Sequence, residues 1–599
     1  MRPTRRNGGY LPIRDYAAIG DGRTVACVGR DGAIDWLCLP DLDSPSVFGA
    51  LVDEQRGGRF ALAPTVPFES ARRYLPNTNV LETTFETAAG TVRVTDALTL
   101  PGRGLSPYRE LVRRVEGGTG EVPLRWSVEP RFGYGTEHGR LAVRGGVPVA
   151  AASRDALAVL SWDAGEVEVG AAAVAGSFRS AADRSSVIAL SVAHQEPLVF
   201  PTRAEVERRL DETARSWRAW ARARTYEGSW RDAVVRSALA LKLLVFAPSG
   251  AIAAAATTSL PEAIGGARNW DYRFSWPRDA SFTLRALLSL GCGGEAHAFF
   301  SWLLHASQLT HPRLDVLYRL NGGADSGERE LPLAGYRGSR PVRIGNGASQ
   351  QLQLDVYGEV LSAAALFAGV AGGLDRDHGR RLAGVADLVC ELWREADAGI
   401  WEVRSDARHF TQSKIMCAVA LDHAVALAEA GRLPDKHVHR WRRESGRVRD
   451  FVEKNCYSDR RGSYARAAGQ EDLDASILLA VLVGYDRADS PRLHKTVDAV
   501  RRELSNGPLV RRYTGDDGLA GEDGAFVACS FWLVEALARQ GRVDEATTLM
   551  DEVVALANDV GLYAEEIDAA TGEFLGNFPQ GLSHLALINA AVTLAEASQ

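Results

Sequence analysis

The chain has 599 residues, of which 46% are hydrophobic and 24% charged, and its formal net charge is −7. A chain of this length exceeds one ordinary hydrophobic core, so we expect two or three domains. The mild negative charge disfavours nucleic acid and anionic membranes as partners and fits a small neutral ligand such as a sugar, while no segment approaches the roughly 18–20 consecutive apolar residues of a membrane helix.

Up to about residue 200 the sequence pattern is typical of β-strands. Residues 91–96 alternate with period two, as does much of 111–129, and Gly and Pro turns recur at short spacing. This pattern predicts an N-terminal β-sandwich domain over residues 1–202. Residues 203–225 contain no Gly or Pro and are rich in Glu, Arg, Ala and Trp, which predicts a linker helix within residues 203–227.

From about residue 230 onward the apolar period is close to 3.6, which predicts helices. The connections between them alternate between short ones and long ones of about 16 to 47 residues, and long loops are uncommon unless they are functional. Six antiparallel hairpins closing into a ring would give an (α/α)6 barrel over residues 228–599, with every long loop on one face. A two-layer helical solenoid would give the same alternation, but no sequence motif repeats at a fixed period. The expected helices span residues 232–247, 279–291, 295–307, 355–371, 379–395, 412–431, 436–456, 473–485, 490–504, 524–541, 542–559 and 581–597.

The first long loop, residues 268–279, combines aromatic and charged side chains. The faces of Trp and Tyr rings stack on the apolar face of a pyranose, and Arg and Asp side chains hydrogen-bond to its hydroxyls. This composition favours sugar binding. The alternative for Asp279 is that it only caps the following helix, since Asp is a favoured N-cap residue.

Two other long loops supply candidate catalytic carboxyls. Glu402 follows Trp401 in an apolar stretch, a setting that raises a carboxyl pKa as a general acid requires; the alternative is an ion pair with Arg404. Glu565 and Glu566 lie in the last long loop, where one of them could activate water; the alternative is solvated charge. A pair of carboxyls is the minimum apparatus for hydrolysing a glycosidic bond.

The loop before the tenth expected helix carries candidates for holding a second sugar. These residues are Arg511, Arg512, Tyr513, Asp516, Asp517, Glu522 and Asp523.

Four separated motifs, in order and across nearly the whole chain, resemble those of glycoside hydrolase family 15, which includes glucoamylases, glucodextranases and actinobacterial-type trehalases. They are residues 13–21 with 35–38 and 43–48; residues 268–273 with Trp276, Arg278 and Asp279; residues 399–402; and residues 563–566 with 576–580.

The resemblance implies an inverting mechanism in which Glu402 is the general acid and Glu565 the general base, with Glu566 as the fallback base. It also implies that Arg278 and Asp279 hold the non-reducing glucose. The remaining substrate-binding residues that it implies are Trp276 stacking near that sugar, Arg512 at the leaving-group sugar, and Tyr272 and Trp401. Two departures, Pro277 and residues 319–328, would reshape the leaving-group site, so they bear on substrate identity more than on reaction type.

No phosphate loop, GxSxG elbow or HExxH helix is present, and the twelve histidines form no ligand set, so we expect no cofactor and no metal.

Seven scattered cysteines (Cys27, Cys38, Cys292, Cys390, Cys417, Cys456 and Cys529) form no CxxC pair, which is typical of buried free thiols in a reducing compartment. No apolar stretch follows Arg2, Arg5 and Arg6, so a secretory signal is not expected. We therefore expect a cytoplasmic protein, and a homo-oligomer is compatible with the sequence.

The expected function is an exo-acting glycoside hydrolase that releases glucose from an α-glucoside, either trehalose or a malto- or isomalto-oligosaccharide. One alternative is an inverting disaccharide phosphorylase, which uses phosphate in place of activated water and lacks the base, so Glu565 argues against it. The other is a catalytically inactive carbohydrate-binding homologue, against which the presence of both candidate glutamates argues.

Overall fold

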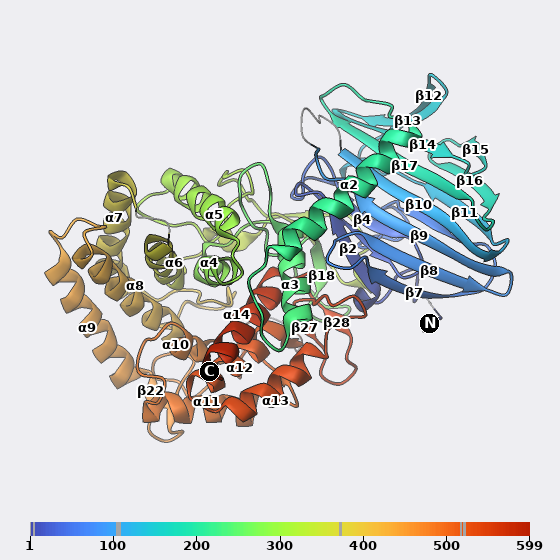
Figure 1. Cartoon of the computed structure of the whole chain (residues 1–599). Coiled ribbons are helices and arrows are strands. Elements are labelled where there is room, and N and C mark those ends of the chain that lie inside the picture. Colours follow the sequence, from blue (N-terminus) through green and yellow to red (C-terminus); the bar gives the residue numbers. More distant parts are fainter. Residues whose placement is uncertain are drawn as a thin grey trace.

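The computed structural model describes residues 2–3, 6–102, 109–370, 374–515, 518, 521 and 523–598. Asp516, Asp517 and Glu522, three of the candidates for holding a second sugar, lie outside the described residues. The described chain forms an N-terminal domain of β-sheets and a C-terminal domain of helices, which stand side by side (Figure 1). The coarse prediction of a β domain followed by a helical domain is therefore correct.

The N-terminal domain consists of two antiparallel sheets whose buried faces share one hydrophobic core. The first sheet has, in spatial order, β1 (Arg2–Pro3), β7 (Phe68–Tyr74), β8 (Leu81–Thr87), β9 (Gly90–Leu98), β10 (Arg109–Gly120), β17 (Ser185–His194), β14 (Asp155–Trp162), β13 (Val147–Ala152) and β12 (Arg140–Arg144). The second has β15 (Glu166–Val169), β16 (Val174–Arg179), β11 (Pro123–Val128), β6 (Phe60–Pro64), β4 (Ile34–Cys38), β3 (Val25–Gly29) and β2 (Tyr16–Gly20), with β5 (Ser46–Phe48) paired to β4.

Helix α2 (Arg203–Arg222) connects the two domains and lies across the strands (Figure 1). It begins at a capping box, in which the side chain of Thr202 accepts from the backbone of Glu205 while the Glu205 side chain accepts from the backbone of Thr202. The buried pair of Arg209 and Glu110 joins the helix to β10. Within the segment expected to be a linker helix, residues 203–222 are helical and contact β10 of the N-terminal domain.

In the helical domain, each of the twelve expected segments overlaps a helix. They are α3 (Arg231–Leu244), α4 (Ala280–Ser289), α5 (Gly293–Ala306), α6 (Asp355–Val370), α7 (Arg376–Leu392), α8 (Thr411–Glu429), α9 (Val438–Asn455), α10 (Leu479–Leu482), α11 (Pro491–Leu504), α12 (Val527–Arg539), α13 (Val543–Val554) and α14 (Gly581–Ala597). The eighth is much shorter than expected, because its first part is the 3-10 helix η6 (Ala475–Leu478).

The helices that follow the long loops form an inner ring. In the described chain, α4 packs on α6, α6 on α8, α8 on α10, α10 on α12, α12 on α14, and α14 on α4. The other helices pack outside this ring, as α9 does on α8 and α13 on α12. Helices α8, α12 and α14 are buried on nearly every side, which is why they lack the one-sided apolar stripe of a surface helix. The long loops that enter the inner helices therefore meet at one end of the ring.

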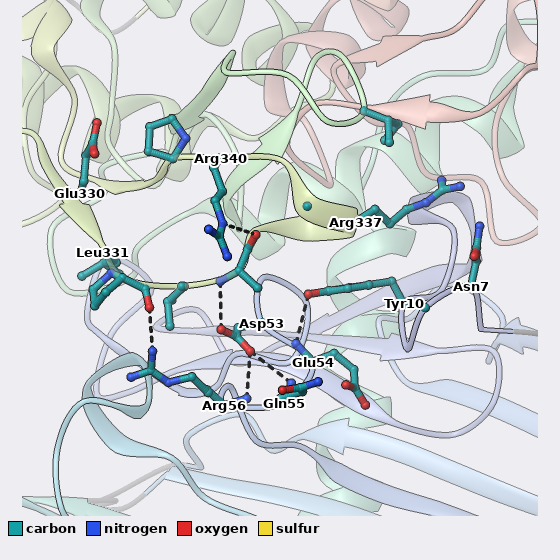
Figure 2. Close-up of a pocket in the computed structure, with 17 residues that line it drawn as sticks. Asn7, Tyr10, Asp53, Glu54, Gln55, Arg56, Glu330, Leu331, Arg337 and Arg340 are labelled. Atoms are coloured by element: carbon teal, nitrogen blue, oxygen red, sulfur yellow. Dashed lines mark hydrogen bonds between the residues drawn. The ribbon is translucent and has the colours of Figure 1, made fainter.

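Specific hydrogen bonds join the two domains. The indole of Trp36 donates to the carbonyl of Ala256, and the hydroxyl of Tyr336 donates to the carbonyl of Leu11. Beside these contacts, a cleft of about 1100 Å³ runs between residues 7–10 and 53–56 of the sandwich and residues 330–341 of the helical domain (Figure 2). Asp53 Oδ2 accepts from the backbone of Ala334 across it at 3.0 Å, so a loop of the β domain holds the second long loop, between α5 and α6, in place.

All seven cysteines are free and buried, as the sequence predicted. Among the described residues, none of the helices has the length and apolar character needed to cross a membrane.

Candidate active site

One pocket at the loop end of the inner ring brings together most of the expected site residues. Seven of the eight residues predicted for catalysis or substrate binding line it: Tyr272, Arg278, Asp279, Trp401, Glu402, Arg512 and Glu565. The sequence did not single out the other lining residues, which are Ala254, Ile400, Phe526, Gln580 and Leu582. Ile400 and Gln580 belong to the quoted motifs, so spacing could have found them, whereas Ala254, Phe526 and Leu582 are ordinary apolar residues without a signal.

Glu402 lies on a strained turn and is held by two donors. Its φ is 57°, in the left-handed region that a non-glycine residue rarely adopts and that is enriched at functional sites. The indole of Trp276 donates to Glu402 Oε1 at 2.7 Å, and Arg278 Nη1 donates to the same oxygen at 3.0 Å. The surroundings of Glu402 are therefore less apolar than the sequence suggested.

Arg278 connects three parts of the pocket wall. Its Nη1 atom also donates to the carbonyl of Ile400 at 2.9 Å, and its Nε atom donates to Asp279 Oδ1 at 3.1 Å. Asp279 occupies the N-cap position of α4, yet its side chain makes no capping hydrogen bond. The capping alternative is therefore wrong, and both side chains face the pocket from the short 3-10 helix η2 (Pro277–Asp279).

Two of the three predicted aromatic residues, Tyr272 and Trp401, line the pocket. Trp276 does not line the pocket itself; it packs edge-on against Tyr272 with ring centroids 5.2 Å apart. Trp401 donates to Asp474 Oδ1 at 2.9 Å and packs edge-on against Phe526. These contacts fix both indoles in orientation, so Trp276 acts on the pocket through Glu402.

Glu565 enters the pocket from the last long loop and is 1% exposed. Its backbone N–H donates to the carbonyl of Asn577, and the backbone N–H of Asn577 donates to Glu565 Oε2 at 3.2 Å. Burial raises the pKa of Glu565 to about 8, the negative charge of Glu262 adds to this rise, and Arg512 opposes it. The hydroxyl of Tyr272 also lies close enough to favour the ionised form.

Glu566 is directed away from the pocket. It begins β27 (Glu566–Ile567), which pairs with β26 (Ala525–Phe526) and β28 (Phe574–Leu575). Glu566 Oε2 accepts from the backbone of Gly524 at 2.9 Å, and Oε1 lies 3.0 Å from Arg512. Glu566 therefore does not line the pocket, whereas the adjacent Glu565 does.

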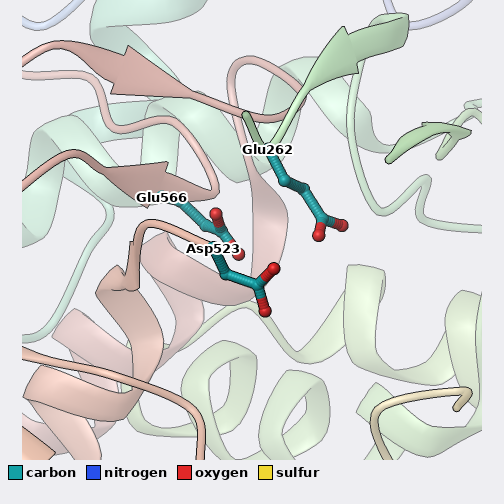
Figure 3. Close-up of side chains that lie close together, drawn as sticks. All are labelled: Glu262, Asp523 and Glu566. Atoms are coloured by element: carbon teal, nitrogen blue, oxygen red, sulfur yellow. The ribbon is translucent and has the colours of Figure 1, made fainter. Parts of the chain in front are cut away.

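Arg512 lies at the centre of a cluster of carboxylates that the sequence did not predict. Its Nη2 atom lies 2.8 Å from Glu262 Oε2, 2.7 Å from Asp523 Oδ2 and 3.0 Å from Glu566 Oε1. Oxygens of the three carboxylates come within 4.8 Å of one another, and the side chains converge from separate segments (Figure 3). Such a group could hold a metal ion, but the guanidinium of Arg512 already contacts all three carboxylates.

Comparisons with known proteins agree with this site. Residues 228–592 match the sequence profile of Glycosyl hydrolases family 15, and residues 8–215 match that of a trehalase-like N-terminal domain. The chain belongs to glycosyl hydrolase family 15. This family 15 protein is 38% identical to a trehalase of Mycolicibacterium smegmatis, over 100% of this chain and 93% of the relative, and 34% identical to a trehalase of Thermoplasma volcanium, over 98% and 94%.

A solved structure shares the fold. A bacterial glucoamylase complexed with acarbose superposes on the family 15 chain with a TM-score of 0.71 and 13% identity, covering 100% of this chain and 96% of its own. The chain is therefore a glycoside hydrolase with a glucoamylase-like fold, consisting of an N-terminal β-sheet domain and a helical C-terminal domain.

Proposed function

We propose that this glycoside hydrolase is an inverting, exo-acting trehalase that releases glucose from an α-glucosidic bond by general acid–base catalysis. The observation that carries the proposal is that Glu402 and Glu565, from loops more than a hundred residues apart, line one pocket together with Arg278 and Asp279. The trehalases of M. smegmatis and T. volcanium, which align over nearly the whole chain, support trehalose over malto- and isomalto-oligosaccharides.

In the proposed reaction Glu402 is the general acid. Its proton passes to the glycosidic oxygen as the C1–O bond breaks and leaves its electron pair on that oxygen. Trp276 and Arg278 both donate to Glu402 Oε1, which holds the carboxyl in one orientation. A general acid fixed in this way loses little rotational freedom at the moment of proton transfer.

Glu565 is the proposed general base. Its carboxylate takes a proton from a water molecule whose oxygen attacks C1 on the face opposite the leaving group, so an α-glucoside gives β-glucose. The raised pKa of Glu565 supports this role, because a base is most effective when its pKa lies near the operating pH. Glu566 is not the proposed base because its carboxylate contacts Arg512 and Gly524.

Arg278 and Asp279 are proposed to bind the hydroxyls of the non-reducing glucose, and Arg512 those of the leaving-group glucose. Arg278 and Arg512 are the charged donors of the pocket, and Asp279 is an acceptor beside Arg278. Trp401 and Tyr272 supply ring faces on the pocket wall. Fixed donors and acceptors of this kind orient a neutral sugar without requiring it to carry charge.

We also propose that the helical domain, residues 228–599, is an (α/α)6 barrel, that residues 1–202 form the β-sandwich domain and that residues 203–227 connect the two. The cyclic contacts of the inner helices support the barrel. Seven free, buried cysteines support a cytoplasmic location, since a reducing compartment keeps thiols unpaired.

A screen of glucose release from trehalose, maltose, isomaltose and longer glucans tests the proposal. We expect trehalose to be the best substrate, and NMR of the first product to show β-glucose. Preferred release from maltose or isomaltose would overturn the substrate assignment. Formation of glucose 1-phosphate in phosphate buffer would instead identify a phosphorylase, and calorimetric binding of a disaccharide without any glucose release would identify an inactive binding protein.

A further inference from the structure

Glu262 is a buried carboxyl that lies outside the lining of the pocket. It follows β18 (Thr258–Pro261), 2% of it is exposed, and Arg512 Nη2 donates to its Oε2 atom at 2.8 Å. Almost fully buried glutamates are rare unless they are paired. Glu262 is therefore not a solvated surface charge, and its pairing with Arg512 needs a functional explanation.

The charges around Arg512 do not balance among the described residues. Glu262, Asp523 and Glu566 all contact Arg512, and Arg268 Nη1 lies 2.5 Å from Asp523 Oδ1. With Glu565 beside them, four carboxyl groups face two guanidinium groups. Like charges in a buried site disfavour ionisation of their neighbours.

Glu262 and Glu565 depend on the same arginine. Arg512 favours the ionised form of each of them, and the negative charge of Glu262 opposes ionisation of Glu565. Burial is the largest cause of the raised pKa values of both Glu262 and Glu565. Among the charged neighbours that affect the pKa of Glu565, Glu262 has the greatest effect. Tyr272, the remaining titratable group facing both, lies close to Glu565 and to Glu262.

We propose that Glu262 is a positioning residue of the general base: paired with Arg512, it draws the charge of that arginine away from Glu565 and so strengthens Glu565 as a proton acceptor. This inference rests on the proposed role of Glu565 and adds a residue that acts on it through Arg512. A stronger base takes more of the proton from water in the transition state. As a consequence, Glu565 stays protonated, and cannot act as the base, up to a higher pH.

The test compares the pH dependence of kcat/KM for the wild-type enzyme and for Glu262→Gln, using whichever α-glucoside the wild type hydrolyses. Gln retains the shape and loses the charge, so we expect the acid limb of the profile to move down by about one pH unit, a usual effect of a neighbouring charge. Glu262→Asp retains the charge and should keep the limb near that of the wild type. A purely structural role would lower kcat at every pH and leave the limb where it is.

Glu359→Gln is the matched control. Glu359 is also a buried glutamate with a pKa raised to about 8, mainly by burial, but it accepts from Ser281 and has no contact with Arg512 among the described residues. Its substitution should not move the acid limb. If Glu262→Gln does not fold, Asp523→Asn removes another carboxylate that contacts Arg512. This variant should likewise move the acid limb to lower pH.

A second measurement needs no activity. Subtracting the infrared spectrum of Glu565→Gln from that of the protein with Glu565 isolates the carbonyl band of the protonated Glu565 carboxyl. The pH at which this band is half lost (the midpoint) is then measured twice, once with Glu262 present and once in the Glu262→Gln background. A lower midpoint in Glu262→Gln supports the proposal, and an unchanged midpoint or acid limb overturns it. If Glu565→Gln retained activity, the base assignment would fail, while the infrared midpoints would still decide whether Glu262 controls Glu565.

Discussion

Arg278 Nη1 lies 3.0 Å from Oε1 of Glu402, although the two residues are 124 positions apart in the chain. The same nitrogen donates to the carbonyl of Ile400, two residues before Glu402, and the Nε atom of the same guanidinium donates to Asp279. One planar side chain therefore sets the position of the candidate acid relative to the candidate sugar-binding carboxylate. Lysine has a single point of charge and cannot bridge these groups in the same geometry.

Arg278→Lys should lower kcat/KM by at least tenfold while the protein remains folded, because the charge is kept and the bridge is lost. We expect kcat to decrease and KM to increase, since Arg278 contacts both Glu402 and Asp279. Steady-state kinetics on trehalose, with circular dichroism to verify folding, measure this. Kinetics equal to those of the wild type would show that the bridge plays no part in catalysis.

Glu402→Gln and Glu565→Gln should each lower kcat by about 10²–10⁴-fold, as loss of acid or base catalysis does. Glu566→Gln is the matched control for Glu565, because the two residues are adjacent and buried but Glu566 contacts Arg512 and the backbone of Gly524. It should retain much more activity than Glu565→Gln. The reverse order would make Glu566 the base, and near-full activity of Glu402→Gln would remove Glu402 from the acid role.

The sequence predicts elements that depend on local periodicity and motifs, and it is less informative about contacts between distant segments. The inner helices were found because apolar residues repeat at the helical period even where the helix is fully buried. The sequence predicts a longer helix than α10, because the apolar residues before α10 form a 3-10 helix, which periodicity does not distinguish from an α-helix.

Glu262 shows what the sequence could not supply. It lies 250 residues from Arg512, in a short segment with no periodic pattern, and only the closing of the chain brings the two together. Glu565 and Glu566 are adjacent in the sequence, and only their contacts in the folded chain distinguish them, since Glu565 lines the pocket and Glu566 contacts Arg512.

Trp276→Phe should lower kcat by about tenfold and change KM little. Phenylalanine keeps an aromatic ring against Tyr272 but removes the N–H that donates to Glu402 Oε1 at 2.7 Å, and such a hydrogen bond contributes about 0.5–1.5 kcal/mol. Trp393→Phe is a suitable control, because it removes an indole donor to Glu444, away from the pocket. Equal kinetics for the two variants would argue that the indole N–H does not support catalysis.

The pH profile of the wild-type enzyme should show its acid limb above the usual range of a glutamate, near pH 8. Burial raises the pKa of Glu565 to about 8, and the base works only when ionised, so kcat/KM should increase as the pH rises through this value. A profile measured with trehalose over the range in which circular dichroism is unchanged tests this. A limb near pH 4 would mean that Glu565 is far better solvated in the free enzyme.

Arg72→Met should weaken the attachment of the β-sandwich to the helical domain. The buried side chain of Arg72 lies 2.8 Å from Asp559, which is 29% exposed and also pairs with Arg30, so the loss of a hydrogen bond to this charged group should cost about 1.5–3 kcal/mol. Although burial would raise the pKa of Asp559, Arg72 and Arg30 hold it below the ordinary value. This contribution to stability is complete above the unfolded pKa of about 3.9 and disappears as the pH falls through the lower folded value. Thermal unfolding of wild type and Arg72→Met should therefore differ most at neutral pH and converge in acid, whereas a constant difference would attribute the loss to packing alone.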